Sequence, residues 1–264
     1  MSVLHSGIPR IRSLAIAALA VLAGSPATVA EPRSDTPDGE ELVAGALDQW
    51  RGNTSESRIE VVIHRPDWER TLSMRLWTAG KDRSLVRVLS PESEAGTGHL
   101  LMDGSMWTFS PDVDRVVRVP GSMMSQQWLS SDFTNNEIAR SDSILEDYEP
   151  EVVDHWEEDG LRHYELRLEP HEEAPVVWGH QELVIREDHI LMRQAFHDQG
   201  GDQVKTLRTE EVGERGGRQV AVRQRMEPVD DDERWTEVTV EEAEYDLDLP
   251  DQVFSVANLR NPRF

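Results

Sequence analysis

Cysteine is absent from this 264-residue chain. Disulfide scaffolds, thiolate zinc sites, iron–sulfur clusters, cysteine nucleophiles and lipid attachment through an N-terminal cysteine are therefore excluded. Positive charge is also scarce, because 27 Lys and Arg residues stand against 51 Asp and Glu residues, for a formal net charge of -24. A surface of that sign repels phosphate backbones, so we expect no nucleic-acid partner.

Familiar catalytic motifs are missing as well. The chain has no His-Glu-x-x-His, no Gly-x-Ser-x-Gly and no Walker loop, and Gly96-Thr97-Gly98 lacks the third glycine of a dinucleotide site. Three stretches hold metal-ligating residue types, but their spacing favours a solvated surface: His171–Glu173, His197-Asp198 and Asp230–Glu233. We therefore expect a protein that is not an enzyme and that has neither cofactor nor metal.

Residues 1–30 have the layout of a cleaved secretory signal peptide. Arg10 and Arg12 give a basic start, residues 14–23 form an apolar stretch, and residues 28–30 supply small side chains before the expected cleavage point. The apolar stretch is too short to span a bilayer. We expect a soluble, exported protein, and an uncleaved anchor is the alternative interpretation.

Apolar and polar residues alternate along most of the remaining chain, which predicts strands with one buried face. Ile59, Val61 and Ile63, for example, alternate with Arg58 and Glu60. Links such as Asp103-Gly104 are typical of hairpin turns, so consecutive strands should pair antiparallel within one domain over residues 31–264. The expected strands are 59–63, 72–76, 85–89, 99–103, 105–110, 114–119, 150–157, 161–169, 178–187, 190–198, 203–213, 217–227 and 233–246.

Two segments interrupt this succession of strands. Residues 37–50 place apolar side chains at helical spacing and begin with acids that suit the helix dipole. Residues 120–148 form an apolar insertion with a short helix expected near Asn135–Arg140. An open sheet must cover its apolar face. A strongly curved sheet wrapped around the helix and the insertion satisfies that requirement.

The most specific motif lies between residues 100 and 148. Its elements follow in order along the chain: Trp107, Phe109 and Pro111, then Arg115 and Arg118, then Met123-Met124, then Ser131-Asp132-Phe133-Thr134. This succession, together with the tail from Leu249 to Leu259, resembles the LolA-like family of outer-membrane lipoprotein-sorting proteins. The resemblance implies a mainly β fold with a few helices: an unclosed antiparallel β-barrel of about eleven strands, with helices lidding its concave apolar face.

The resemblance also implies a function. LolA-like proteins are periplasmic, and the chain would bind the acyl chains of a lipid or lipoprotein in an apolar groove, as a monomer, with an inner-membrane RND-type exporter as its suggested partner. A periplasmic sensor of lipid or lipoprotein that regulates envelope stress signalling is the alternative. An outer-membrane β-barrel is a third interpretation, which Pro262 beside the final residues and the charged outward strand faces disfavour.

Large apolar residues of the helix, the strands and the insertion are the candidate ligand-binding residues of the groove and its lid, since thioethers and rings adapt to chains of different length. They are Leu47, Trp50, Met74, Leu76, Trp107, Phe109, Met123, Met124, Trp128, Leu129 and Phe133. Core packing is the alternative role for each. Arg115 and Arg118 lie three apart on a strand and should point to opposite faces. Either arginine could contact a lid carbonyl or a ligand headgroup, and surface ion pairing is the alternative.

Overall fold

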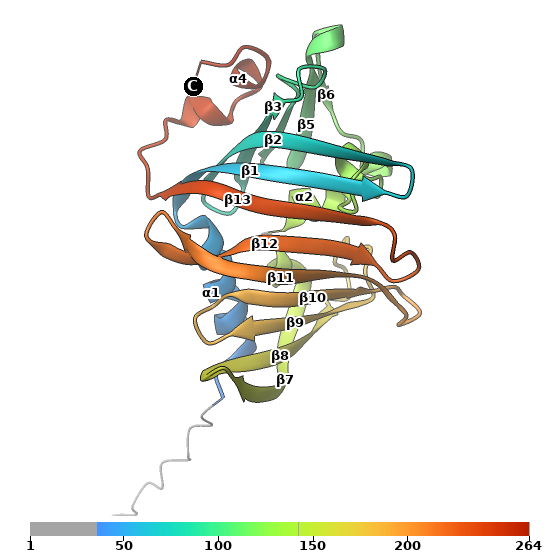
Figure 1. The fold of residues 1–264 in the computed structure, drawn as a ribbon, viewed down its shortest axis with the longest axis vertical. Coiled ribbons are helices and arrows are strands. Elements are labelled where there is room, and N and C mark those ends of the chain that lie inside the picture. Colours follow the sequence, from blue (N-terminus) through green and yellow to red (C-terminus); the bar gives the residue numbers. More distant parts are fainter. Residues whose placement is uncertain (1–35, 142, 264) are drawn as a thin grey trace, which may run out of the picture. The chain divides into compact units, whose positions relative to one another are not determined.

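A single antiparallel sheet of thirteen strands dominates the computed structural model, which describes residues 36–141 and 143–263. The strands lie in the order β6-β5-β4-β3-β2-β1-β13-β12-β11-β10-β9-β8-β7. The first and the last strand in sequence, β1 and β13, are therefore neighbours at the centre of the sheet (Figure 1). Within the described residues, β6 and β7 remain as the two edges of the sheet. The unclosed antiparallel sheet is confirmed, with thirteen strands instead of about eleven.

Every strand expected from alternation is present, and the first of them, 59–63, is the centre of a longer β1. The strands are β1 (Thr54–Arg65), β2 (Trp68–Ala79), β3 (Arg83–Ser90), β4 (Gly98–Met102), β5 (Ser105–Ser110), β6 (Arg115–Arg118), β7 (Tyr148–Glu158), β8 (Leu161–Pro170), β9 (His180–Arg186), β10 (Leu191–His197), β11 (Gln203–Arg215), β12 (Arg218–Pro228) and β13 (Trp235–Tyr245). Residues 1–30, where we expect the signal peptide, lie outside the described residues.

Both expected helices form, and local capping explains where they begin. Asp38 caps α1 (Gly39–Arg51), because its carboxylate accepts a hydrogen bond from the Glu40 amide at 2.7 Å. Thr134 and Glu137 cap α2 (Asn135–Arg140) reciprocally. The short helices are η1 (Pro111–Val113), η2 (Gly121–Met123), η3 (Trp128–Ser130), α3 (Ile144–Asp147), η4 (Asp251–Phe254) and α4 (Val256–Arg260). None of the described helices is long and apolar enough to cross a membrane.

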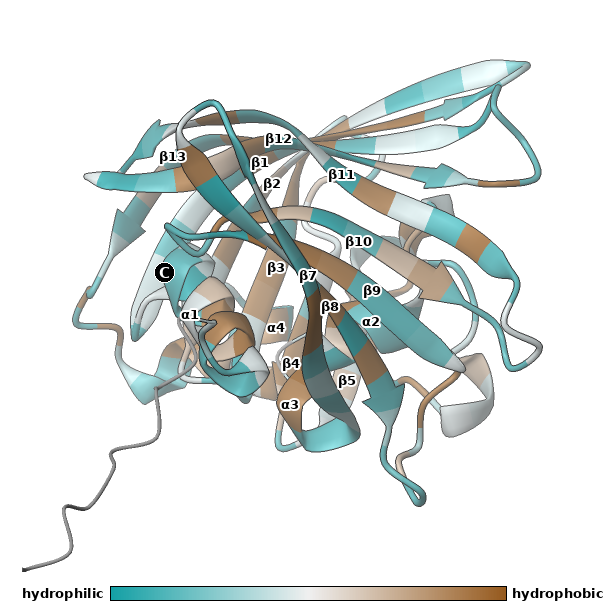
Figure 2. Cartoon of the chain, turned by 90° about the horizontal axis from the view of Figure 1, so that it is seen from below, coloured by the Kyte–Doolittle hydropathy of each residue, from teal (hydrophilic) through white to brown (hydrophobic). Residues whose placement is uncertain are grey.

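Helix α1 covers one end of the concave face of the sheet. It packs on β7, β9 and β12, and its Leu42 and Val43 are buried with Leu166 and Ile185 of the sheet. Figure 2 shows α1 and α2 beneath the arch of the strands, with the apolar part of α1 turned inward. Helices therefore lie over part of the concave apolar face, as the family resemblance implies.

The C-terminal segment covers part of the opposite, convex face. Phe254 and Leu259 of η4 and α4 pack on Trp77 and Leu100, whose side chains point away from the concave face because they alternate with residues such as Leu76. The Arg87 guanidinium holds this segment by donating to the carbonyls of Asn258 at 3.0 Å and Leu259 at 2.9 Å. Burial lowers the pKa of Arg87.

The close contact between α1 and β7 yields the first prediction. A Cβ atom at Gly39 would lie 2.5 Å from the carbonyl oxygen of Pro150, so Gly39→Ala must displace the helix or the strand. Although Ala is the better helix residue by about 1 kcal/mol, we expect the substitution to lower the free energy of unfolding by about 1–3 kcal/mol.

Urea unfolding checks this expectation. Gly121→Ala is the control, because its Cβ would meet no atom within 4 Å, and it should leave the stability unchanged or slightly raised. If Gly39→Ala behaved like this control, the contact between α1 and β7 would be too loose to position the helix.

Candidate functional site

A cavity of about 390 Å³ lies between the concave face of the sheet, α1 and the insertion. Its size falls within the range of small-molecule sites. Apolar side chains from the central strands form much of its floor, and many of them are only half-buried because they face the cavity: Ile59, Leu76, Leu191, Val238 and Val240. The cavity therefore presents apolar surface inside the fold.

Five of the eleven candidate residues line this cavity. Leu47 and Trp50 come from α1, Leu76 comes from β2, and Trp128 and Phe133 come from the insertion. Trp50 is exposed and Trp128 is buried, with 39% and 5% of their surfaces accessible. The structure brings these three separate segments to one place, and the binding role of their side chains stays a prediction.

Two candidates are packed in a core cluster beside the cavity and two lie on the far side of the sheet. Met74 is fully buried and Leu129 half-buried in the core cluster that also holds Trp128. Trp107 and Phe109 belong instead to the cluster under the C-terminal segment. Strand alternation sends both rings to the convex face, so they are withdrawn from the candidate groove.

The remaining candidates lie on the surface. Met123 is exposed and Met124 is half-buried at η2. Arg115 is exposed on the edge strand β6, and Arg118 donates to the Ser105 hydroxyl at 2.8 Å. Neither arginine lines the cavity, so a role for them in contacting a ligand there has no support in the geometry.

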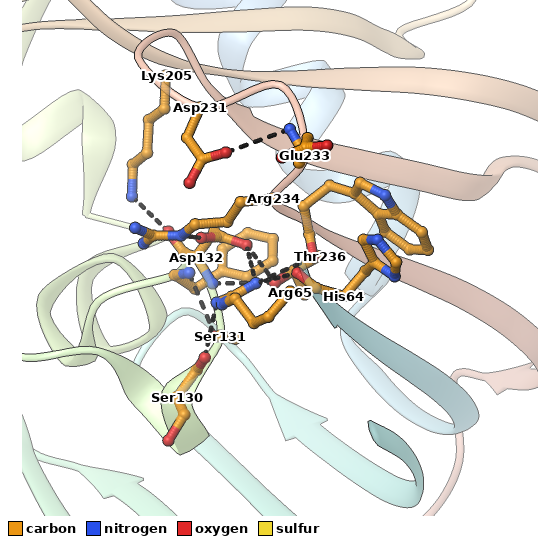
Figure 3. A network of polar contacts seen from close by, with 12 residues as sticks. His64, Arg65, Ser130, Ser131, Asp132, Lys205, Asp231, Glu233, Arg234 and Thr236 are labelled. Carbon is orange, nitrogen blue, oxygen red and sulfur yellow. Dashed lines mark hydrogen bonds and ion pairs between the residues drawn. The ribbon is translucent and has the colours of Figure 1, made fainter. Parts of the chain in front are cut away.

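A buried carboxylate fixes the insertion to the sheet (Figure 3). The Asp132 side chain, 1% accessible, accepts from Arg65 at 3.0 Å, from Arg234 at 2.6 Å and from the Thr236 hydroxyl at 2.7 Å. The Thr236 hydroxyl also accepts from the Asp132 amide at 3.0 Å. Arg65 ends β1, while Arg234 and Thr236 lie at the start of β13, so one carboxylate ties the insertion to two adjacent strands.

Lys205 of β11 extends this network along the rim of the cavity. Its buried ammonium donates to the Asp132 carbonyl at 2.7 Å and to Glu137 of α2 at 2.8 Å. The ammonium also lies 5.3 Å from the ring centre of Trp178 and 5.4 Å from that of Phe196. The segment from residue 128 to α2 is therefore held by charges at Asp132 and at Glu137.

Sequence reasoning missed these anchoring cations. Arg65, Lys205 and Arg234 are far apart in the sequence, and nothing in their local patterns separates them from surface charges. One signal was present, because Lys205 is one of only two lysines in the chain. An acid in the middle of an apolar insertion, as Asp132 is, also indicates a buried partner.

Several polar groups on the cavity wall are paired. Asp147 accepts from Arg140 at 2.8 Å, which raises the pKa of that guanidinium, and Glu137 pairs with Lys205. The amide of Gln194 donates to that of Gln181 at 2.6 Å. These pairs leave the apolar side chains as the main surface that the wall offers to a ligand.

Arg51 is a buried cation on the cavity wall. Arg51 is buried at the end of α1, donates to the Arg83 carbonyl at 3.3 Å and lies over the Trp50 ring, 5.2 Å from its centre. Burial lowers the pKa of Arg51 to about 10. The guanidinium therefore stays charged at neutral pH at this end of the cavity.

Comparison with known proteins places the chain in a family. The family model described as "Uncharacterized protein" matches residues 80–261. The chain belongs to that family. Among curated proteins, no sequence matches it.

Solved structures identify the fold. A DUF1329 family protein from Desulfovibrio piger superposes with a TM-score of 0.75 at 23% identity, covering 85% of this chain and 100% of the other. A LolA superfamily protein from Nitrosomonas europaea gives 0.69 at 22% identity, covering 83% and 98%. A domain from Vibrio parahaemolyticus named for outer membrane lipoprotein sorting gives 0.72 at 18% identity, covering 84% and 98%. The fold is LolA-like, as the sequence resemblance predicts.

The Asp132 anchor of this LolA-like fold yields the second prediction. Asp132→Asn leaves Arg65 and Arg234 without their counter-charge, and breaking one side of a buried ion pair costs about 3–5 kcal/mol. We expect chemical denaturation to report a loss of that size. Asp231→Asn, in the nearby loop between β12 and β13, is the control and should change the free energy of unfolding by less than about 0.5 kcal/mol. A small loss for Asp132→Asn would show that the anchor is dispensable.

The third prediction concerns His99, which packs against Trp128 with ring centres 5.5 Å apart. Neither nitrogen of its buried ring has a hydrogen-bond partner in the part of the chain that the structure describes, and burial lowers the pKa of His99 to about 4. The folded state therefore prefers the neutral ring. Above pH 6.5 the ring is neutral in both states, and the free energy of unfolding is unaffected. As the pH falls from 6.5 to 4, the unfolded state binds a proton on His99 and the folded state does not, so the free energy of unfolding falls by roughly 3 kcal/mol in total.

His99→Leu removes this titration. The free energy of unfolding, measured by urea at pH 7 and at pH 4, should then differ less between the two pH values than it does in the wild type. His155→Leu, at an exposed position of β7, is the control and should keep the wild-type difference. An unchanged difference in His99→Leu would assign the acid sensitivity to other groups.

Proposed function

We propose that this protein is a periplasmic carrier that binds the acyl chain of a lipid or an acylated protein in the cavity beneath the sheet. One observation carries the proposal: apolar side chains of β1, β2, β10 and β13 line a cavity of about 390 Å³ and are only half-buried there. Apolar surface left open inside a fold marks a binding site for an apolar ligand. Binding, not catalysis, is the proposed activity.

Electrostatics of the wall favour a methylene chain over a polar ligand. Glu137 and Asp147 are already paired with Lys205 and Arg140. A ligand charge placed against the apolar floor, away from Arg51 at the end of α1, would lose its hydration without gaining a partner. Each methylene moved from water to the floor contributes roughly 0.8 kcal/mol.

Relatives by fold support the same class of ligand and the same compartment. Two of the structures that share this fold are named as a LolA superfamily protein and as a domain of outer membrane lipoprotein sorting. A periplasmic location would also agree with the signal peptide expected over residues 1–30.

A chain-length series tests the proposal and is the fourth prediction. Fluorescent fatty acids that differ only in chain length should bind about fourfold more tightly for each added methylene, because roughly 0.8 kcal/mol per methylene corresponds to that factor in Kd. The gain should stop once the chain fills the cavity. Affinity independent of chain length would contradict an acyl-chain site.

A filling variant locates the site. Val240→Phe adds a ring to the cavity floor, where Val240 pairs with Ile59 of β1. We expect at least about a tenfold loss of probe affinity with little loss of stability, since the ring occupies open apolar space. Val153→Phe, at an exposed position of the edge strand β7, is the matched control and should bind the probe normally. Equal binding by both variants would place the probe outside the cavity.

A further inference from the structure

Two buried histidines lie side by side on neighbouring strands. His180 of β9 is the register partner of His197 of β10, and their rings stack with centres 4.0 Å apart and planes 13° apart. The two residues are 8% and 7% accessible. Among the described residues, Nδ1 of His197 is buried and has no hydrogen-bond partner. An unpartnered ring nitrogen in such a place calls for a ligand that can accept its lone pair or its proton.

This pair lies apart from the proposed acyl site. Gln181 and Phe196, the neighbours of the two histidines in sequence and register partners of each other, line the cavity. Successive side chains of a strand point to opposite faces. His180 and His197 therefore belong to the convex face, so whatever they bind is separate from a ligand beneath the sheet.

Glu182 completes a set of three metal-ligating side chains on this face. One ligand atom from each of His180, Glu182 and His197 lies within 4.8 Å of the others, and Nε2 of His180 lies 4.0 Å from Oε1 of Glu182. We propose that these three residues form a binding site for a divalent transition metal such as Zn²⁺. Two imidazoles and one carboxylate are a recognised zinc ligand set that leaves a fourth position for water or another ligand.

The charges around the cluster suit a metal. Glu182 supplies a negative charge to offset that of the cation. Two nearby arginines already have closer partners than this site: Arg193 lies 2.6 Å from Glu165 and 3.7 Å from Glu182, and Arg167 lies 2.6 Å from Glu169.

Metal binding requires the side chains to move. Bonds of 2.0–2.1 Å in a tetrahedral zinc site place neighbouring ligand atoms about 3.3 Å apart, compared with 4.0 Å between His180 and Glu182 and up to 4.8 Å within the set of three. Because a metal lies in the plane of each imidazole that binds it, the two rings must also turn out of their parallel stack. The Glu182 side chain is 29% accessible, so it can rotate toward the rings, and its exposure gives the ion a path from solvent. A bound metal would then join β9 to β10 on the convex face.

Isothermal titration with Zn²⁺ tests the site, and it is the fifth prediction. Millimolar Mg²⁺ in the buffer occupies oxygen-only sites on this acidic surface but competes poorly for imidazole. We expect one Zn²⁺ per chain, with affinity reduced at least about tenfold in His180→Ala and in His197→Ala. His155→Ala, which removes a histidine from an exposed position of β7, should bind as the wild type does. Binding that all of these variants retain would overturn the proposal.

A second measurement guards against variants that fail to fold. Glu182→Gln changes a partly exposed side chain, keeps its shape and removes the charge, so it should fold normally and weaken Zn²⁺ binding. In the wild type, Co²⁺ should give the strong visible absorption of a tetrahedral site, and Zn²⁺ should raise Tm until one equivalent is bound. Absent Co²⁺ absorption, together with a Tm that Zn²⁺ leaves unchanged, would show that the three residues bind no transition metal.

Discussion

Burial of the Asp132 carboxylate between Arg65 and Arg234 determines where the insertion lies. A carboxylate in the protein interior is tolerated only with cations and hydrogen-bond donors around it, and here those donors lie at the end of β1 and the start of β13. The strands are neighbours in the sheet although 170 residues separate Arg65 from Trp235, whose carbonyl also accepts from that arginine. Once the carboxylate is held there, the positions of Trp128 and Phe133 on either side of it follow.

The cavity results from two anchored elements that leave the middle of the concave face uncovered. Helix α1 covers the strands near β7, and the insertion covers the strands near β3, so the floor between them is only partly covered. Apolar side chains such as Val238 and Val240 stay half-buried there. The anchoring charges are satisfied at the rim, by Lys205 with Glu137 and by Arg140 with Asp147, and this leaves the floor to the apolar ligand that we propose.

Strand alternation gives the two faces of the sheet different side chains and different packing partners. On the concave face, Leu76 and its neighbours line the cavity, while Trp77 and Phe109 on the convex face pack under the C-terminal segment. Farther along the sheet, the same convex face brings His180 beside His197. A ligand beneath the sheet and a metal on top of it would therefore share β9 and β10 without touching the same side chains.

Local sequence patterns determined the strands and helices of this protein. Contacts between residues far apart in the sequence determined which side chains meet at the cavity, at Asp132 and at the histidine pair. The period of apolar residues located all the strands and α1, and the motif around Ser131–Thr134 indicated the LolA-like fold, because alternation, helical spacing and caps act within a few residues. Leu47, Trp50, Leu76, Trp128 and Phe133 could be chosen for the cavity by size and position. Trp107 and Phe109 could not be assigned to a face, since which face of an edge hairpin is covered depends on where the C-terminal segment docks. Arg65, Lys205 and Arg234 became visible only when the fold brought them to Asp132, and His180 met His197 only through the register of β9 with β10.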